Sequence, residues 1–330
     1  MQIVVVAPPI AEYAINPVED EMRRLGHEVI RYKDVAAFMA KTDALAEADI
    51  LFGNGYPCTA ELIGRGPKLR AIVTPWIGTE GFDMAAATAR GILVANGQVP
   101  ENYLSMAEAT IMLILASLHN FPEKIAAMKA NQPAPVRAKA RMMRGKTIGM
   151  IGFGNMARAI TSRLENWGVT LQTYAPRIRK PLPDGVTRVE LDDLLKTSDI
   201  VCILSTLNNE TRGMLSLEKL RLMKQDAILI NTARGYVAPE TAIEAIAKEG
   251  RLHKIALDVF ETEPLPADSP LRDLPNMILT PHCVGHSREG AEAVPKTAIA
   301  NIVSALSGEP PLYTLNVDAI PAWQKRWTKP

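Results

Sequence analysis

Short apolar, partly β-branched segments alternate with amphipathic segments along most of the 330-residue chain. In the first 98 residues the apolar segments predict five strands: Ile3–Ala7, Glu28–Tyr32, Asp49–Phe52, Ala71–Thr74 and Ile92–Val94. Helical spacing predicts helices between them: Pro17–Leu25, Thr59–Gly64 and Asp83–Arg90. Because strands and helices alternate, we expect a parallel sheet with helices on both faces.

The pattern changes at Pro100, which opens a long helix predicted from Tyr103 to about Phe121. Its sequence ATIMLILASL is apolar nearly all round, so the helix must be buried on more than one side. We interpret it as a core helix between domains and also as a dimer interface. The segment 131–135 then breaks the helix, and the basic connector 136–146 is interpreted as a solvated linker.

Further strand and helix units follow the connector and predict a second doubly wound parallel sheet. The expected strands are Lys146–Ile151, Thr170–Tyr174, Ile200–Leu204, Ala227–Asn231, Lys254–Leu257 and Met277–Leu279. Helices are expected at Leu191–Lys196, Leu217–Met223 and Pro239–Lys248, and a last helix, Ser287 to about Leu306, is expected to return to the first half. This predicts an α/β chain of two domains, residues 1–99 plus 287–330 and residues 100–286, with a ligand cleft between them.

The segment GKTIGMIGFGNMA, residues 145–157, has the features of a dinucleotide-binding turn. An apolar strand runs into Gly152 and Gly154, and a helix follows. The first glycine permits a tight turn, the second lets phosphates approach the backbone, and the helix start offers unpaired N–H groups. Ala157 stands at the third glycine position, which the pattern tolerates.

Composition excludes several classes of protein. Lys and Arg number 37 against 36 Asp and Glu, so bulk charge gives no reason to expect nucleic acid or an anionic membrane surface. The longest apolar run, Ile111–Ala116, is too short to span a bilayer. The start MQIVVVAPP lacks the features of a signal peptide, and the three scattered cysteines have no metal-ligand spacing. We therefore expect a cytoplasmic protein without a metal site.

Three further segments stand at predicted strand ends in the second half: INTARG (230–235), LDVFETEP (257–264) and TPHCVGH (280–286). Taken alone, Arg234 can be a surface cation, Glu263 a turn residue and His282 a locally hydrogen-bonded histidine. Their positions favour a common site, because parallel strands end at the same edge of the sheet as the glycine turn.

These segments, in this order and spacing, resemble those of the D-isomer-specific 2-hydroxyacid dehydrogenases, and the resemblance covers nearly the whole chain. It implies a Rossmann nucleotide-binding domain and a flavodoxin-like substrate domain. It also implies a nicotinamide cofactor, a small 2-oxo or 2-hydroxy acid substrate, and a homodimer. The activity that it implies is hydride transfer between the nicotinamide and C2 of the substrate.

The resemblance also assigns roles to residues. Arg234 matches the arginine that binds the substrate carboxylate and C2 oxygen, and His282 the acid/base at that oxygen. Glu263 matches the carboxylate that orients the imidazole and raises its pKa. Ile77 and Gly78 match the loop whose N–H groups meet the substrate carboxylate. Trp76 is either an apolar wall beside that loop or part of the core of the first domain.

Cofactor contacts come from the same resemblance, and Asp258 matches a carboxylate near the nicotinamide carboxamide. The remaining expected contacts are Gly152, Phe153, Gly154, Asn155 and Met156 in the glycine turn, and Ser205, Thr206, Thr232, Ala233 and Gly285 after later strands.

The adenosine end of the cofactor site departs from the usual NAD pattern. An acidic residue normally follows the second strand and binds the ribose hydroxyls, but Ala175 stands at this position. Arg177, Arg179 and Lys180 come directly after it. With no carboxylate to repel a phosphate, we expect NADP(H) in preference to NAD(H).

Several alternatives stay open. The substrate can be glyoxylate, hydroxypyruvate or a larger apolar 2-oxo acid, and a related dehydrogenase of a different small acid is a third possibility. A cofactor-sensing corepressor or scaffold on the same fold is the non-enzymatic alternative. Near the C-terminus, Trp323 and Trp327 are expected to pack on the first domain, with a cover over the cleft as the second choice.

Overall fold

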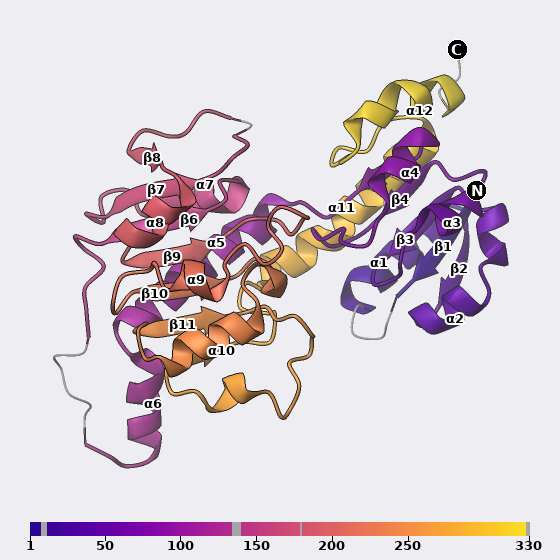
Figure 1. The fold of residues 1–330 in the computed structure, drawn as a ribbon. Helices are drawn as coiled ribbons and strands as arrows, with labels where there is room; N and C mark the ends of the chain where they lie inside the picture. Colours follow the sequence, from indigo (N-terminus) through magenta and orange to yellow (C-terminus); the bar gives the residue numbers. More distant parts are fainter. Residues whose placement is uncertain (8–11, 134–139, 179, 328–330) are drawn as a thin grey trace. The chain divides into compact units, whose positions relative to one another are not determined.

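The computed structural model describes residues 1–7, 12–133, 140–178 and 180–327. It divides into two compact units, Met1–Asn102 with Ser287–Pro330, and Tyr103–His286. Each unit contains its own parallel β-sheet with flanking helices (Figure 1). The predicted α/β class with two doubly wound parallel sheets is confirmed. The expected cleft between the domains stays a prediction.

The sheet of the first unit has five parallel strands in the order β2-β1-β3-β4-β5. Alternate residues of β1 face opposite sides, so Ile3 and Val5 join one apolar cluster and Val4 and Val6 the other. Helices α1, α11 and α12 pack into the first cluster, and α2, α3 and α4 into the second. The strands are β1 (Gln2–Val6), β2 (Glu28–Tyr32), β3 (Ile50–Gly53), β4 (Ala71–Val73) and β5 (Leu93–Ala95), and the helices are α1 (Glu12–Arg24), α2 (Val35–Ala40), α3 (Ala60–Gly64), α4 (Met84–Ala89), α11 (Arg288–Ser307) and α12 (Ile320–Trp327).

Capping side chains explain why three helices of this unit begin where the sequence predicts. Thr59, Asp83 and Ser287 each accept a hydrogen bond from the backbone N–H three residues later. The predicted start of the first helix at Pro17 is wrong, because α1 begins at Glu12 and contains Pro17. Ala14 and Ile15 are buried with Val18, so packing on the sheet favours the earlier start.

The C-terminal tryptophans pack on the first unit, as predicted. Trp323 is fully buried, and its indole N–H donates to the carbonyl of Arg70 at 2.9 Å. The ring of Trp327 packs against the same core, with the Arg70 guanidinium 4.6 Å from its centroid.

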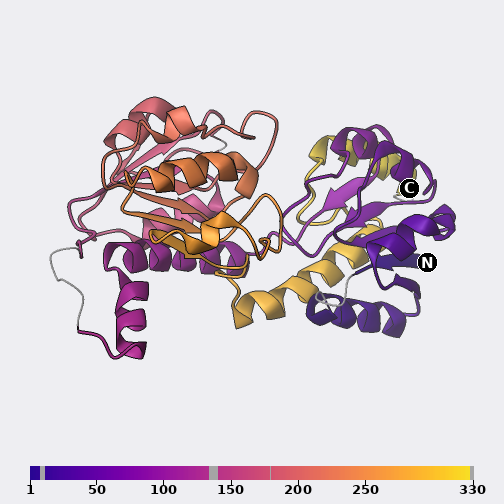
Figure 2. The same cartoon turned by 60° about the horizontal axis from the view of Figure 1, so that its bottom comes forward.

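The second unit has seven parallel strands in the order β12-β11-β10-β9-β6-β7-β8, and Figure 1 labels all but β12 in this sequence across the sheet. Helices α8, α9 and α10 pack on one face, and α5 and α7 on the other (Figure 2). The strands are β6 (Thr147–Ile151), β7 (Thr170–Tyr174), β8 (Val186–Arg188), β9 (Ile200–Ile203), β10 (Ile228–Asn231), β11 (Lys254–Leu257) and β12 (Met277–Leu279), and the helices are α5 (Pro100–Leu118), α6 (Phe121–Lys129), α7 (Asn155–Arg163), α8 (Leu191–Thr197), α9 (Leu217–Leu220) and α10 (Glu240–Lys248).

The predicted long apolar helix is α5, but it ends at Leu118 and a second helix, α6, follows. Asn120 adopts the left-handed conformation between them, and Pro122, which has no N–H to donate, lies in the first turn of α6. Burial of α5 on several sides is confirmed, although Met112 is 51% exposed. Residues 136–139 of the connector predicted as a solvated linker lie outside the described residues.

In the described part of the chain, no single helix is long and apolar enough to cross a membrane. Only α5 and α6 taken together meet such a test by length and composition, and they are bent by 65° with respect to each other.

Candidate active site

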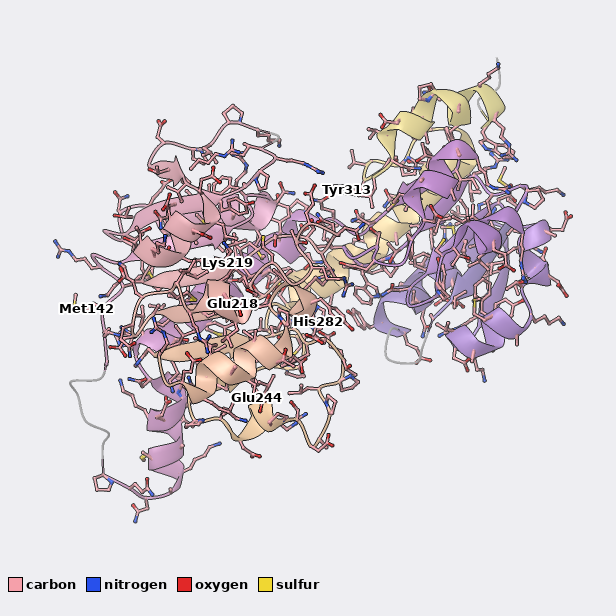
Figure 3. The ribbon with its side chains drawn as sticks, in the orientation of Figure 1. Met142, Glu218, Lys219, Glu244, His282 and Tyr313 are labelled. Atoms are coloured by element: carbon pink, nitrogen blue, oxygen red, sulfur yellow. The ribbon has the colours of Figure 1, made fainter. Side chains whose placement is uncertain are left out.

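The candidate site of the second unit lies where three neighbouring strands end. Parallel strands β10, β11 and β12 lie side by side, so the segments that follow them begin at the same edge of the sheet. Arg234 follows β10, Asp258 and Glu263 follow β11, and His282 follows β12. Figure 3 shows His282 at the end of the second unit away from the labelled Met142.

His282 and Glu263 form a direct pair, with His282 Nδ1 2.6 Å from Glu263 Oε2. The hydrogen bond to Glu263 raises the pKa of His282 above its ordinary value, although burial acts in the opposite direction. The negative charge of Glu263 adds to the rise. The imidazolium is therefore favoured at neutral pH more than in a free histidine.

The Glu263 carboxylate is held in its charged form by its surroundings. Burial alone would raise its pKa, but hydrogen bonds from His282 and from the N–H of Phe260 lower it below the ordinary value. The positive charges on His282 and Arg234 lower it further. Glu263 thus stays an acceptor for the imidazole.

Arg234 lies close enough to act electrostatically on both partners. Its positive charge lowers the pKa of Glu263, and it opposes the rise in the pKa of His282. The turn that carries it is fixed by Asn231, whose side chain accepts from the N–H of Ala233 at 3.1 Å and donates to the carbonyl of Arg234 at 3.0 Å. Arg234, Glu263 and His282 therefore lie at the same strand ends, close enough for their charges to interact.

Asp258 holds the turn on which His282 lies. Its carboxylate is buried, and Oδ1 accepts from Thr280 Oγ1 at 2.7 Å and from the N–H groups of Cys283 and Val284 at 3.0 and 3.1 Å. His282 itself has a left-handed backbone with φ 52°, which these bonds on both sides support. This structural role was not predicted, and no local motif indicates it, because the acceptor and donors are more than 20 residues apart.

The geometry of the glycine turn fits a dinucleotide pyrophosphate. Gly152 has φ 98°, and a Cβ there would lie 2.9 Å from the backbone of Ser205. A Cβ on Gly154 would meet open space, so that side of the turn is accessible to a ligand. No side chain caps α7, whose first N–H groups and positive dipole end are suited to an anion. Asn155 and Met156 form the first turn of this helix.

The side chains of several expected cofactor contacts have other partners. The ring of Phe153 is buried, with the Arg158 guanidinium 5.1 Å from its centroid. Thr232 Oγ1 lies 3.1 Å from Thr110 Oγ1 of α5, and Gly285 packs so closely on Met106 of α5 that a Cβ would overlap it. At Phe153, Thr232 and Gly285 it is therefore the backbone, and not the side chain, that is available to bind a cofactor.

Two expected contacts follow β9, next to the glycine turn. The hydroxyl of Ser205 is buried and has no hydrogen-bond partner among the described residues, so it is suited to a ligand. The carbonyl of Thr206 accepts from Thr211 Oγ1 at 2.8 Å, which begins an ordered turn.

The loop after β7 gathers more cations than the sequence indicates. Ala175 is buried at the strand end, and Arg177 is exposed. Arg158 of α7 donates to the carbonyl of Lys180 at 2.6 Å, and Arg188 of β8 donates to the carbonyl of Pro176 at 3.3 Å. Arg158 and Arg188 were not predicted, because Arg158 lies 22 positions from Lys180 along the chain and Arg188 belongs to the strand that follows the loop. The predicted contact Arg179 lies outside the described residues.

The predicted substrate loop of the first unit follows β4. Trp76 packs against its core, with its ring centroid 5.8 Å from that of Tyr13, so the packing alternative is observed. The Asn96 side chain donates to the carbonyl of Ile77 at 2.8 Å and fixes the loop. Among the described residues, the N–H groups of Ile77 and Gly78 have no acceptor, as a carboxylate-binding loop requires. Contact of this loop with a substrate stays a prediction.

No group of three or more His, Cys, Asp and Glu side chains suited to a metal ion occurs in the described ranges. The cysteines Cys58, Cys202 and Cys283 are free thiols, and only Cys283 is exposed.

Known proteins similar to this chain include several dehydrogenases. D-3-Phosphoglycerate dehydrogenase of Methanocaldococcus jannaschii is 33% identical over 326 residues, which cover 96% of this chain and 60% of the relative. The chain thus spans about three fifths of the length of that relative. Glyoxylate reductase of Thermofilum pendens is 34% identical over 270 residues, 79% of each chain. The solved structure of NAD-dependent formate dehydrogenase from Staphylococcus aureus, in complex with NAD, matches with TM-score 0.81 and 27% identity, covering 94% of this chain and 97% of the other.

A family profile gives the same result. The profile described as D-isomer specific 2-hydroxyacid dehydrogenase, NAD binding domain, matches residues 111–284, which is more than half of the chain. This match includes the glycine turn and the strand ends that carry Arg234, Glu263 and His282. The chain belongs to the D-isomer-specific 2-hydroxyacid dehydrogenase family.

Proposed function

We propose that this protein is a 2-oxo acid reductase that uses NADP(H) in preference to NAD(H). The observation that carries the proposal is the His282–Glu263 pair, with its raised histidine pKa, beside the charge of Arg234. A proton donor and a cation at the same strand ends as a dinucleotide turn suit reduction of a carbonyl next to a carboxylate.

The cofactor would be held by the backbone of the glycine turn and by the start of α7, and Ser205 offers a hydroxyl. When bound, the nicotinamide supplies the hydride that reduces C2 of the substrate. Asp258 is proposed to lie near the carboxamide, in addition to fixing the His282 turn.

The proton for the C2 oxygen comes from His282. Its Nδ1 is bound to Glu263, so Nε2 is the nitrogen left to donate. As the hydride adds to C2, the carbonyl oxygen gains negative charge and takes this proton, which gives the 2-hydroxy acid and a neutral imidazole. Glu263 keeps the ring in position and favours its reprotonation from solvent.

Arg234 binds the substrate. Its planar guanidinium presents parallel N–H donors that suit the carboxylate and the neighbouring C2 oxygen. The same charge offsets the negative charge that develops on this oxygen. The N–H groups of Ile77 and Gly78 supply a second set of donors for the carboxylate, and Trp76 borders their loop.

The preference for NADP(H) is supported by the charges after β7. The 2′-phosphate carries close to two negative charges at neutral pH. Four basic residues belong to this loop or bind its backbone: Arg177, Lys180, Arg158 and Arg188. Ala175, buried at the strand end, provides no carboxylate. NAD(H) remains a usable second cofactor in this proposal.

Turnover with each cofactor tests the proposal. We expect oxidation of NADPH with glyoxylate, hydroxypyruvate or phenylpyruvate, measured by absorbance, at a kcat/KM at least about tenfold above that with NADH. The three substrates differ in size at C3 and therefore measure the room available there. Faster turnover with NADH would contradict the cofactor preference. Cofactor binding without any turnover would favour the corepressor or scaffold function instead.

We further propose a homodimer formed through α6 rather than through α5, the helix interpreted from sequence as the dimer interface, because most apolar residues of α5 are buried or half-buried in their own unit. Its apolar residues Phe121, Ile125 and Met128 follow helical spacing on one face and are 55, 41 and 82% exposed. Apolar stripes this exposed on a monomer favour association, and the family resemblance names a second copy as the partner.

A glutamate pair on this stripe is expected to dissociate the dimer. Wild type should sediment as two chains of 36.0 kDa each, and the I125E/M128E variant as one. The matched control is L312E, which changes an apolar residue of the first unit that is 82% exposed and should leave the dimer intact. A monomeric wild type, or a variant that remains dimeric, would refute this interface.

A further inference from the structure

One carboxylate stands opposite the basic loop after β7. Glu210 Oε1 lies 2.7 Å from Arg177 Nη2, although the two residues are 33 positions apart in sequence. The positions that directly follow β7, residues 175–180, contain no acidic residue, so no acid was predicted there. The described structure instead provides a carboxylate from the loop after β9.

The backbone of Glu210 is fixed by an ordered turn. The Asn208 side chain accepts from the N–H groups of Glu210 and Thr211 at 2.8 and 3.0 Å. Thr211 Oγ1 in turn donates to the carbonyl of Thr206. The backbone that carries Glu210 is thus anchored in the loop that begins with Ser205 and Thr206, both expected to meet the cofactor.

The pair spans the end of β6. Strand β6 lies between β7 and β9, so the segments that follow β7 and β9 flank the glycine turn, about 10 Å apart at their strand ends. Arg177 reaches from one segment and Glu210 from the other. An ion pair at this position lies where the adenosine half of the dinucleotide passes from the glycine turn to the end of β7.

We propose that Glu210 is a specificity-determining residue that weakens the binding of NADP(H) and so keeps NAD(H) usable. This inference rests on the proposed function. Glu210 occupies a donor of Arg177 that a 2′-phosphate needs, and its own charge repels the phosphate within the Debye length. NAD(H) has ribose hydroxyls at this place, and a carboxylate accepts hydrogen bonds from hydroxyls without charge repulsion.

The exposure of Arg177 and Glu210 limits how much their ion pair can weaken NADPH binding. Arg177 and Glu210 are 78% and 63% exposed, and ion pairs this exposed are weak. A dianionic phosphate can therefore displace Glu210, at a moderate loss of affinity. Replacing Glu210 by glutamine should tighten NADPH binding about fivefold and change NADH binding less than about twofold.

Binding of NADPH and NADH without substrate, followed by their fluorescence, tests the inference with four variants: E210Q, R177Q, R177Q/E210Q and E249Q. Glu249 is the matched control, since it also forms an ion pair with an arginine, Arg221. Glu249 lies directly after α10, where the chain leads into the start of β11, so it is at the opposite end of the strands from the cofactor site. E249Q removes the same charge from the same unit and should alter neither dissociation constant.

The expected result is a gain for NADPH in E210Q that disappears in the R177Q background, where no guanidinium remains to be released. If E210Q changes the binding of both cofactors equally, the role of Glu210 is refuted. The same holds if E210Q weakens NADPH binding and R177Q weakens it too; in both cases the NADP(H) preference stands. If R177Q leaves NADPH binding unchanged, the basic loop is not the phosphate site, and both proposals fail.

Discussion

Replacing His282 by alanine is expected to lower kcat for reduction of a 2-oxo acid by about three orders of magnitude. The substitution removes the proton donor for the C2 oxygen but leaves the glycine turn and Arg234 in place. The measurement is the initial rate of NADPH oxidation near neutral pH, with the dissociation constant of NADPH measured beside it. Cofactor binding should change little, which separates loss of chemistry from loss of folding.

The matched control is H119A. His119 is an exposed histidine directly after α5, about 20 Å along that helix from Met106, which contacts Gly285 of the candidate site. Its replacement should leave kcat unchanged. A kcat within tenfold of wild type in H282A would exclude His282 as the proton donor.

The pH profile gives an independent measure of the same residue. Reduction needs the imidazolium, so kcat/KM should be high at low pH and fall as pH rises through the pKa of His282, which Glu263 raises. Oxidation of the 2-hydroxy acid needs the neutral imidazole, so its rate should fall as the pH is lowered through the same pKa. E263Q removes the negative charge of the partner and leaves a neutral amide oxygen as the acceptor, so the alkaline fall in reduction should move to lower pH. An unchanged profile in E263Q would contradict the proposed role of the pair.

Replacing Arg234 by alanine is expected to lower kcat/KM for the 2-oxo acid by about three orders of magnitude. The variant lacks both the donors for the substrate carboxylate and the charge that offsets the developing negative charge at C2 oxygen. R234K retains the charge but not the planar fork, so an intermediate loss is expected. Saturation kinetics with glyoxylate would separate the effect on KM from that on kcat.

The control for Arg234 is R221A. Arg221 is a half-exposed arginine paired with Glu249 in the same unit, and its segment precedes β10, away from the strand ends that carry the site. Near wild-type kcat/KM is expected. If R234A and R221A behaved alike, Arg234 would have no part in substrate binding.

The strand pattern and the strand-end residues were predictable from sequence for a local reason. Strands such as β11 and β12 are short, mainly apolar runs between turn residues, and their predicted bounds are those of the structure. Parallel topology then brings Arg234 and His282 to one edge, so their proximity follows from the strand order. The pairing of His282 with Glu263 came from the family resemblance, and the structure places the two atoms in contact.

Other features depend on contacts that no local pattern contains. The start of α1 before Pro17 is determined by packing on the sheet, and the three-residue edge strand β8 is too short for a periodic signal. Glu210 reaches Arg177, and Arg158 the Lys180 carbonyl, only because α7 and the loops after β7 and β9 surround the end of β6. Sequence order alone separates these residues by 22 to 33 positions.

The bond between the N–H of Asp258 and the carbonyl of Asn231, 3.0 Å long, joins two anchors. Asn231 fixes the turn of Arg234, and Asp258 fixes the turn of His282. Guanidinium and imidazole therefore belong to one preorganised frame within residues 103–286. A substitution that breaks either anchor is therefore expected to displace the substrate-binding guanidinium and the proton-donating imidazole together.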